Sequence, residues 1–135
     1  MTYHQTYHHK YAKYKKKYLA LGKKLEHIIK YANGNVYEGL LDIFSGKPHG
    51  QGTLTHQDGT FYKGNWKYGK KHDHGVETYS DGYKYEGEWV DGEKHGSGTL
   101  IKKNGEIVNQ EWKFDKLQAP RQEERIKLMK QLGIL

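Results

Sequence analysis

The sequence predicts a mainly β protein: an extended meander of antiparallel β-hairpins with an N-terminal amphipathic helix and a C-terminal capping helix. Three observations predict it. Motifs recur every 23 residues in the middle of the chain, and within each repeat Tyr, Gly and Trp alternate with charged residues, as in a strand with one buried face. Before the repeats, apolar residues follow a heptad spacing. We therefore divide the chain into residues 1–32, 33–116 and 117–135.

The first segment predicts the helix. Tyr and apolar residues alternate at spacings of four and three, which is the seam of an amphipathic or coiled-coil helix, while the lysines avoid these positions. Gly22 within it costs about 1 kcal/mol relative to Ala. The seam consists of Tyr7, Tyr11, Tyr14, Tyr18, Leu21, Leu25 and Ile28.

Positive charge is concentrated in the same segment. Residues 1–32 hold eight Lys against one acid, Glu26, whereas residues 33–116 hold eleven Lys against thirteen acids. We therefore expect any attraction to nucleic acid or anionic lipid in the first segment. The candidate anion-binding residues are Lys13, Lys15, Lys16 and Lys17. Nucleic acid is the less favoured partner, because the Tyr side chains share one face instead of being interleaved with the lysines.

The 23-residue period places a Trp and a turn in register in successive repeats. The Trp residues are Trp66, Trp89 and Trp112, and the turn glycines Gly59, Gly82 and Gly105 each follow an Asp or Asn. Residues 83–89 read as a strand, 90–96 as a turn of several residues and 97–102 as a second strand. The Asn-Gly or Asp-Gly pair then suits a type I′ turn. Gly87, between two aromatic residues, leaves room for a ring to lie flat on the backbone.

Residues 85–89, Tyr-Glu-Gly-Glu-Trp, followed by Gly92, His95, Gly96 and Gly98, resemble the YxGxWxxGxxHGxG consensus of the MORN (membrane occupation and recognition nexus) repeat family. The resemblance covers residues 33 to about 116 and implies an elongated, twisted meander of hairpins. The family has been linked to phosphoinositide binding and membrane tethering, and to dimerisation and scaffolding.

The terminal repeats depart from the consensus. The first has Leu41 in place of Trp and a turn two residues longer, and the last has Val108 and Gln110 in place of Tyr and Gly. Degenerate terminal units are typical of repeat arrays, in which they act as caps.

The repeated histidines His49, His72 and His95 suggest either a metal site or a structural role in a turn. Adjacent hairpins lie about 10 Å apart, whereas zinc needs ligands at about 2 Å, so we favour the structural role and expect no metal or cofactor. The acids read as a solvated face. No Ser/His/Asp arrangement or GxxxxGK[ST] phosphate loop occurs, so we expect no enzyme activity.

The aromatic residues of the repeats are expected to form the core and an aromatic groove for a partner. They are Tyr37, Tyr62, Trp66, Tyr85, Trp89 and Trp112. We therefore predict a non-catalytic scaffold that binds protein partners or itself through the repeat sheet and the N-terminal helix. The alternative is a peripheral membrane adaptor that binds anionic lipid through its basic segment.

Two further features complete the prediction. Residues 11–21 resemble a Lys/Tyr string found near the start of many giant double-stranded DNA virus proteins, which implies a viral origin. With no Cys and no apolar run of about 20 residues, the chain is expected in the cytoplasm, or in a host cell or virion if viral. After the repeats, Pro120 is placed to start a helix whose apolar side could cover the edge of the last strand.

Overall fold

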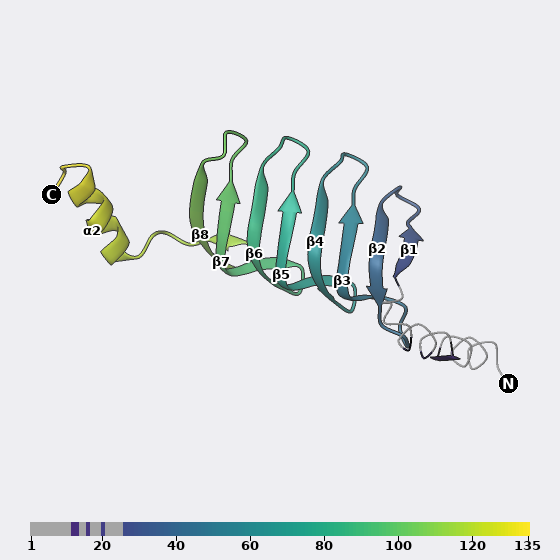
Figure 1. Cartoon of the computed structure of the whole chain (residues 1–135). Coiled ribbons are helices and arrows are strands. Elements are labelled where there is room, and N and C mark those ends of the chain that lie inside the picture. Colours follow the sequence, from purple (N-terminus) through teal and green to yellow (C-terminus); the bar gives the residue numbers. More distant parts are fainter. Residues whose placement is uncertain (1–11, 14–15, 17–19, 21–25) are drawn as a thin grey trace.

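The computed structural model describes residues 12–13, 16, 20 and 26–135 and shows one antiparallel sheet of nine strands in the order in which they occur along the chain. Figure 1 shows the strands side by side in a single curved layer. The strands are β1 (His27–Lys30), β2 (Val36–Leu41), β3 (Pro48–Thr55), β4 (Phe61–Lys67), β5 (Lys70–Thr78), β6 (Lys84–Val90), β7 (Glu93–Ile101), β8 (Ile107–Lys113) and β9 (Lys116–Leu117). The predicted meander of hairpins is confirmed.

The Asx-Gly turns join β1 to β2, β3 to β4, β5 to β6 and β7 to β8. In the turn after β5, Tyr79 N donates to Tyr83 O at 2.9 Å and Gly82 N donates to Tyr79 O at 3.0 Å, which closes a three-residue loop. Only the glycine has a positive φ, 92° at Gly82, so the predicted type I′ geometry is wrong for these turns. The Asp81 carboxylate instead accepts a hydrogen bond from Tyr83 N at 3.2 Å, which holds the loop in an Asx turn.

Type I′ geometry occurs in the turns at the opposite ends of the strands. Between β6 and β7 the chain turns within two residues, Asp91 and Gly92, with φ values of 49° and 90°. The expected turn over 90–96 is therefore too long, because β7 already begins at Glu93. The pairing shifts register between Gly87 and Trp89, so the extra residues form a β-bulge inside the strand. The longer first turn is confirmed, since residues 42–47 separate β2 from β3.

A row of six paired glycines crosses the sheet from β2 to β7, and the bulges follow directly after it. A Cβ on Gly75 would lie 2.1 Å from the Tyr62 hydroxyl oxygen, and a Cβ on Gly98 would lie 2.2 Å from that of Tyr85. Each Tyr ring therefore lies directly on glycine backbone. Gly87 takes part as predicted, since its Cβ would lie 2.5 Å from the Tyr85 hydroxyl. The row consists of Gly39, Gly52, Gly64, Gly75, Gly87 and Gly98.

The N-terminal boundary differs from the prediction. Residues 27–30, assigned to the helix from their heptad spacing, form strand β1 and pair with β2. Ile28, the last predicted seam residue, is therefore in a strand and 65% exposed. The reason is that the alternating sequence His-Ile-Ile-Lys completes a hairpin through the turn at Asn33-Gly34, which supplies β2 with a pairing partner. The other seam residues lie outside the described part of the chain.

The C-terminal helix α2 spans Gln122–Gln131, close to the predicted start at Pro120. It has a capping box in which Arg121 N donates to the Glu124 carboxylate at 3.2 Å. None of its residues is buried, and it extends away from the sheet in Figure 1. The prediction that it caps the last strand is thus wrong, because the short strand β9 pairs with β8 at that edge instead.

Candidate functional site

The core of the protein is a single file of aromatic rings along one face of the sheet, which we call the aromatic face. Each ring meets the next edge-on, with interplanar angles of 82–90°. Ring centroids are 5.1 Å apart for Tyr62–Trp66, 5.4 Å for Tyr62–Trp89 and 6.0 Å for Tyr85–Trp112. The face therefore links every repeat to the next through T-shaped aromatic contacts.

Most of the predicted aromatic row is buried. Tyr37, Tyr62 and Tyr85 have no exposed surface, Trp66 and Trp89 are nearly buried, and Trp112 is half-buried. Their polar atoms bond to the backbone at the first two repeats, where Tyr62 Oη donates to Asn65 O at 2.9 Å and Trp66 Nε1 donates to Gly52 O at 3.0 Å. Trp89 Nε1 also donates to the backbone, at Gly75 O, whereas Tyr85 Oη and Trp112 Nε1 have no such partner among the described residues. These six side chains are thus primarily core.

A buried ion pair interrupts the aromatic face at its centre. Glu77, 8% exposed, occupies the place that Leu54 and Leu100 hold in the neighbouring repeats, and its carboxylate pairs with the Lys71 ammonium. Tyr79 Oη also donates to Glu77, at 3.0 Å. Lys71 and Glu77 are six residues apart in β5, and a straight strand would separate them by about 20 Å. The contact between their side chains therefore shows that β5 bends toward the aromatic face.

Lys94 lies one repeat further along, in a cage of rings. Its Nζ lies 4.6 Å from the centroid of the Tyr85 ring, 4.7 Å from that of Trp112 and 5.5 Å from that of Tyr79. Lys71 is placed similarly, with Nζ 4.6 Å from the Trp89 ring centroid. Both lysines fill the space between aromatic rings, where cation–π attraction offsets part of the cost of desolvating them.

Burial governs the titration of these groups. Desolvation raises the pKa of Tyr37 to about 12, with smaller contributions from Tyr31 and Glu26, and raises the pKa of Tyr85 to about 12. Desolvation lowers the pKa of Lys94, although the charges of Glu77 and Asp115 oppose this effect.

The same site occurs once per repeat, and one copy of it is open. The second site contains Tyr62, Trp89 and Lys71, and the third contains Tyr85, Trp112 and Lys94. At the first site, Tyr37 and Trp66 form the same edge-on pair with centroids 5.5 Å apart, but none of the lysines that the structure describes lies over these rings. A pocket of about 490 Å³ remains there instead. It is lined by Tyr31, Asn33, Asn35, Tyr37, Lys47, Pro48, Leu54, Trp66, Tyr68, Gly69 and Lys70.

Sequence reasoning missed Lys71, Lys94 and Glu77. The lysines are 23 residues apart, so they follow the repeat, and Glu77 stands one period from both Leu54 and Leu100. The available signal was an acidic residue at a strand position that is Leu in the neighbouring repeats. Because buried acids are rarely found without a partner, such a residue predicts a nearby cation. The pairing itself depends on the bend of β5.

The three repeated histidines stabilise the two-residue turns. His49 Nδ1 accepts a hydrogen bond from Tyr68 N at 3.3 Å, and His72 Nδ1 accepts one from Asp91 N at the same distance. Each histidine therefore joins one repeat to the turn of the next, which is the structural role favoured from the sequence. Within residues 26–135 and the four described residues before them, no three His, Asp or Glu side chains gather as a metal-ligand set.

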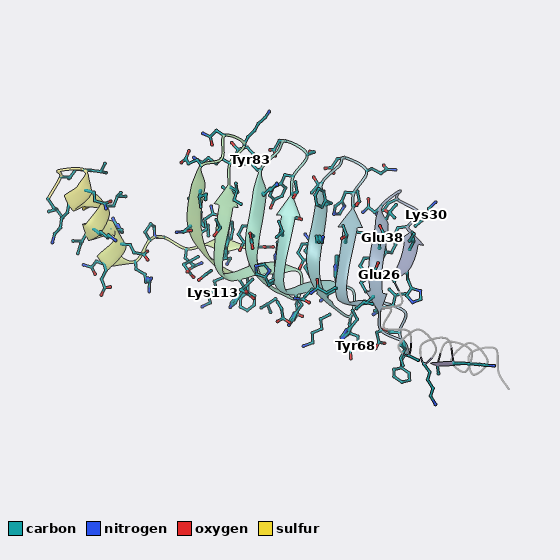
Figure 2. All side chains as sticks on the ribbon, viewed as in Figure 1. Glu26, Lys30, Glu38, Tyr68, Tyr83 and Lys113 are labelled. Carbon is teal, nitrogen blue, oxygen red and sulfur yellow. The ribbon has the colours of Figure 1, made fainter. Side chains whose placement is uncertain are left out.

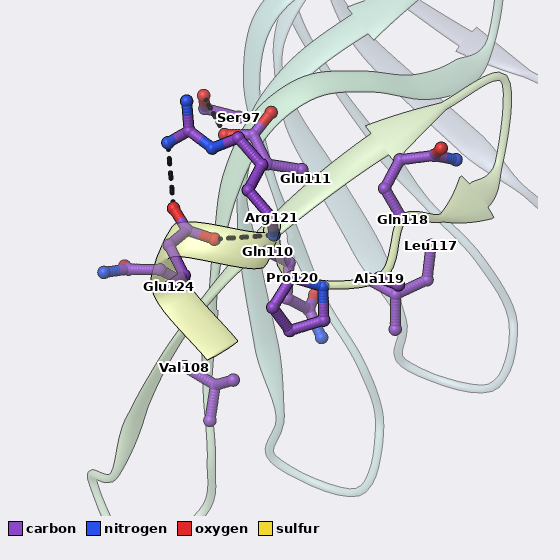
Figure 3. A pocket seen from close by; sticks show the side chains of 11 residues that line it. Ser97, Val108, Gln110, Glu111, Leu117, Gln118, Ala119, Pro120, Arg121 and Glu124 are labelled. Atoms are coloured by element: carbon purple, nitrogen blue, oxygen red, sulfur yellow. Dashed lines mark hydrogen bonds and ion pairs between the residues drawn. The ribbon is translucent and has the colours of Figure 1, made fainter. Parts of the chain in front are cut away.

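A second, larger pocket of about 960 Å³ lies between β8 and the segment that leads to α2. Figure 3 shows the side chains that line it, among them Pro120, Arg121 and Glu111, with the Arg121–Glu124 contact drawn as a dashed line. Polar residues such as Gln110 and Ser97 line it, and Ser97 Oγ donates to the Glu111 carboxylate at 2.6 Å. It lacks the aromatic walls of the first site.

Of the candidate anion-binding lysines, Lys13 and Lys16 are described and exposed, whereas Lys15 and Lys17 lie outside the described residues. No helix in the described part of the chain is both long and apolar enough to cross a membrane.

The fold and its repeated site define a single-layer β-hairpin repeat protein. The family model of the MORN repeat matches residues 44–61, 62–82 and 85–107, which run from the loop before β3 to the start of β8. These three segments are consecutive MORN repeats, as the consensus resemblance implied. MORN repeats are commonly protein- or membrane-interaction modules and are generally not enzymes. A search of curated proteins gave no significant match.

Proposed function

We propose that this chain is a non-catalytic assembly module that binds protein partners, or a second copy of itself, through its repeat sheet and its N-terminal segment. One observation carries the proposal. The core is contained within a single layer, and no described element covers either face of the sheet (Figure 1). A sheet that stabilises itself through its own aromatic face leaves a long surface for partners.

The N-terminal segment supplies the second part of the proposal. Its seam from Tyr7 to Leu25 has the spacing of a packing helix, and we propose that this seam docks on a partner or on a second copy. With β1 beginning at His27, the proposed helix ends before that strand.

A second candidate function, a peripheral membrane adaptor, is favoured by one observation: the eight Lys against one acid in residues 1–32. Such a segment is attracted to anionic lipid by about 1 kcal/mol per basic residue near the surface.

Two full-length variants distinguish the candidates. The first, Tyr14→Ala with Tyr18→Ala, removes two seam side chains and keeps the charge. The second, Lys15→Glu, Lys16→Glu and Lys17→Glu, reverses charge and keeps the seam. Sedimentation velocity reports self-association, and co-sedimentation with phosphatidylserine vesicles reports lipid binding.

The assembly proposal predicts that the seam variant loses self-association, with little dependence on salt, and that the charge variant keeps it. The adaptor requires the reverse pattern, with vesicle binding that falls steeply between about 50 and 200 mM salt. A wild-type chain that is monomeric, captures no protein and pellets fully with vesicles would overturn the assembly proposal.

A further inference from the structure

We infer that the first aromatic site receives an apolar or aromatic side chain of a protein partner, inserted from a segment whose neighbouring residues are acidic. The inference rests on the proposed assembly function and names the site and the chemistry of the partner. It starts from the equivalence of the three sites along the aromatic face.

Pro48, Lys71 and Lys94 stand 23 residues apart, and their backbones have the same role. The carbonyl of Pro48 accepts a hydrogen bond from Gly69 N at 2.8 Å, and the carbonyl of Lys71 accepts one from Gly92 N at 2.8 Å. The carbonyl of Lys94 accepts one from Asp115 N at 3.0 Å. The three residues therefore occupy equivalent positions near the start of their strands, and Pro48 differs from the other two in its side chain.

The lysines fill the second and third sites, whereas the short ring of Pro48 cannot reach between Tyr37 and Trp66. The first site thus keeps the aromatic walls of the others, and no side chain from the described residues occupies it. Its pocket of about 490 Å³ is large enough for one aromatic side chain.

Equivalence alone would suggest that a lysine of the partner enters the first site, but the charges argue against it. Glu77 pairs with Lys71 in the second site and attracts Lys94 in the third. In the first site the equivalent residue is Leu54, and no described residue lining the pocket is acidic.

Two lysines, Lys47 and Lys70, line the open pocket instead. Both are exposed, so their charges act at its mouth while Leu54 and Trp66 form its walls. An inserted ammonium would be repelled there and would find no carboxylate, whereas an apolar side chain would be buried and adjacent carboxylates would meet the two ammonium groups. The partner is therefore an acidic segment with one apolar anchor residue. Tyr68, which is labelled in Figure 2, also lines this pocket and is 54% exposed.

The test titrates the full-length protein with two probe peptides, each acetylated and amidated: Glu-Glu-Phe-Glu-Glu and Lys-Lys-Phe-Lys-Lys. Binding is followed by the NMR shift of the Trp66 indole N–H, which donates to Gly52 O from the wall of the site. We expect saturable shifts with the acidic peptide and none with the basic peptide at the same concentration.

Pro48→Lys should fill the first site as Lys71 fills the second, and so weaken binding of the acidic peptide about thirtyfold, the loss of one buried hot-spot contact. Lys47→Glu with Lys70→Glu leaves the pocket intact and should exchange the preference of the two peptides. The control, Lys63→Glu with Lys84→Glu, makes the same change in net charge on the face of the sheet opposite the aromatic residues, at positions that do not line the pocket, and should leave binding unchanged.

Preference of the wild type for the basic peptide, or binding of neither peptide, would overturn the inference, as would Pro48→Lys binding like wild type. If Pro48→Lys does not fold, as shown by circular dichroism, the charge variants decide. Loss of peptide binding alongside seam-dependent self-association would refute the inference and leave the assembly function standing. Failure of both would refute both.

Discussion

The ammonium of Lys94 lies 4.7 Å from the centroid of the Trp112 ring. This contact joins the start of β7 to the last Trp of the array, whose indole is only half-buried. Trp112, the last ring of the aromatic face, therefore packs against a lysine side chain and not against the ring of a further repeat. The contribution of each aromatic residue to the free energy of unfolding should vary along the sheet.

The Trp residues should differ in what they contribute to stability. Trp89 is 3% exposed, meets Tyr62 and Tyr85 edge-on and donates to Gly75 O, so Trp89→Ala should cost about 3–5 kcal/mol. Trp112→Ala should cost less, because its ring is half-buried and its Nε1 has no hydrogen-bond partner among the described residues. Urea unfolding measures both, and equal costs would show that the fourth hairpin is not at a weaker end of the core.

The glycine row should not tolerate a side chain. In Gly75→Ala the new Cβ would lie 2.1 Å from the Tyr62 hydroxyl, so the ring or the strand must move, at a cost of about 3 kcal/mol. The matched control is Val76→Ala at the next residue, on the opposite face, where a cost of about 1 kcal/mol is expected. A Gly75→Ala protein as stable as the control would contradict the close contact between Tyr62 and the glycines.

The Lys71–Glu77 pair should depend on both members. Glu77→Leu restores the residue found at 54 and 100 but leaves Lys71 without its carboxylate, so it should cost about 3–5 kcal/mol. Adding Lys71→Met replaces the pair with apolar groups and should recover most of that loss. Thermal unfolding of the two single variants and the double variant gives the coupling energy, and purely additive effects would exclude a buried pair.

Alkaline pH should unfold the protein. The folded-state pKa values of Tyr37 and Tyr85 are raised to about 12, above the value of about 10 in the unfolded chain. Their contribution to stability is therefore complete below pH 10 and is lost as the pH rises from about 10 to 12. Lys94 changes the stability in the opposite direction. Its pKa is lowered in the folded state, so its buried charge, which destabilises the fold, is lost as the pH rises. The buried tyrosines outnumber it, so the net effect is a loss of stability.

Ultraviolet absorbance of tyrosinate and circular dichroism, recorded through the same titration, check this expectation. Exposed tyrosines should ionise first. The buried tyrosines should ionise at higher pH, at the same point in the titration at which the β-sheet signal is lost. Ionisation of all tyrosines near pH 10 with the sheet intact would be inconsistent with a buried Tyr row.

The sequence predicted the repeat region well, because its 23-residue period records the alternation of every strand. It was less informative where two patterns competed. Residues 27–30 continue the heptad spacing and also alternate as a strand, and a β-hairpin partner decided between them. Propensity also misplaced the type I′ turns, which occur at Asp91-Gly92 and Tyr68-Gly69 and not at the turns that contain Gly34, Gly59, Gly82 and Gly105.

The candidate site was predicted only in part. The aromatic residues were identified from their spacing, but the occupants of their sites were not, because Lys71 and Lys94 reach the rings only when the bulges bend the strands. A sequence pattern records which face a residue occupies and not how far a strand bends over that face. The open site at Pro48 therefore became visible only in three dimensions.

The most direct test of this account is the carbon–proton NMR spectrum of the lysine side chains in the full-length protein. Ring currents should shift the ε-methylene signals of Lys71 and Lys94 upfield, and Lys94 should lose its proton at a lower pH than exposed lysines, as burial lowers its pKa. Lys94→Met should remove one of the two shifted signals. If all lysine signals instead cluster at the values of an exposed chain and titrate together, the second and third sites are not filled, and the distinction that leaves the first site open fails.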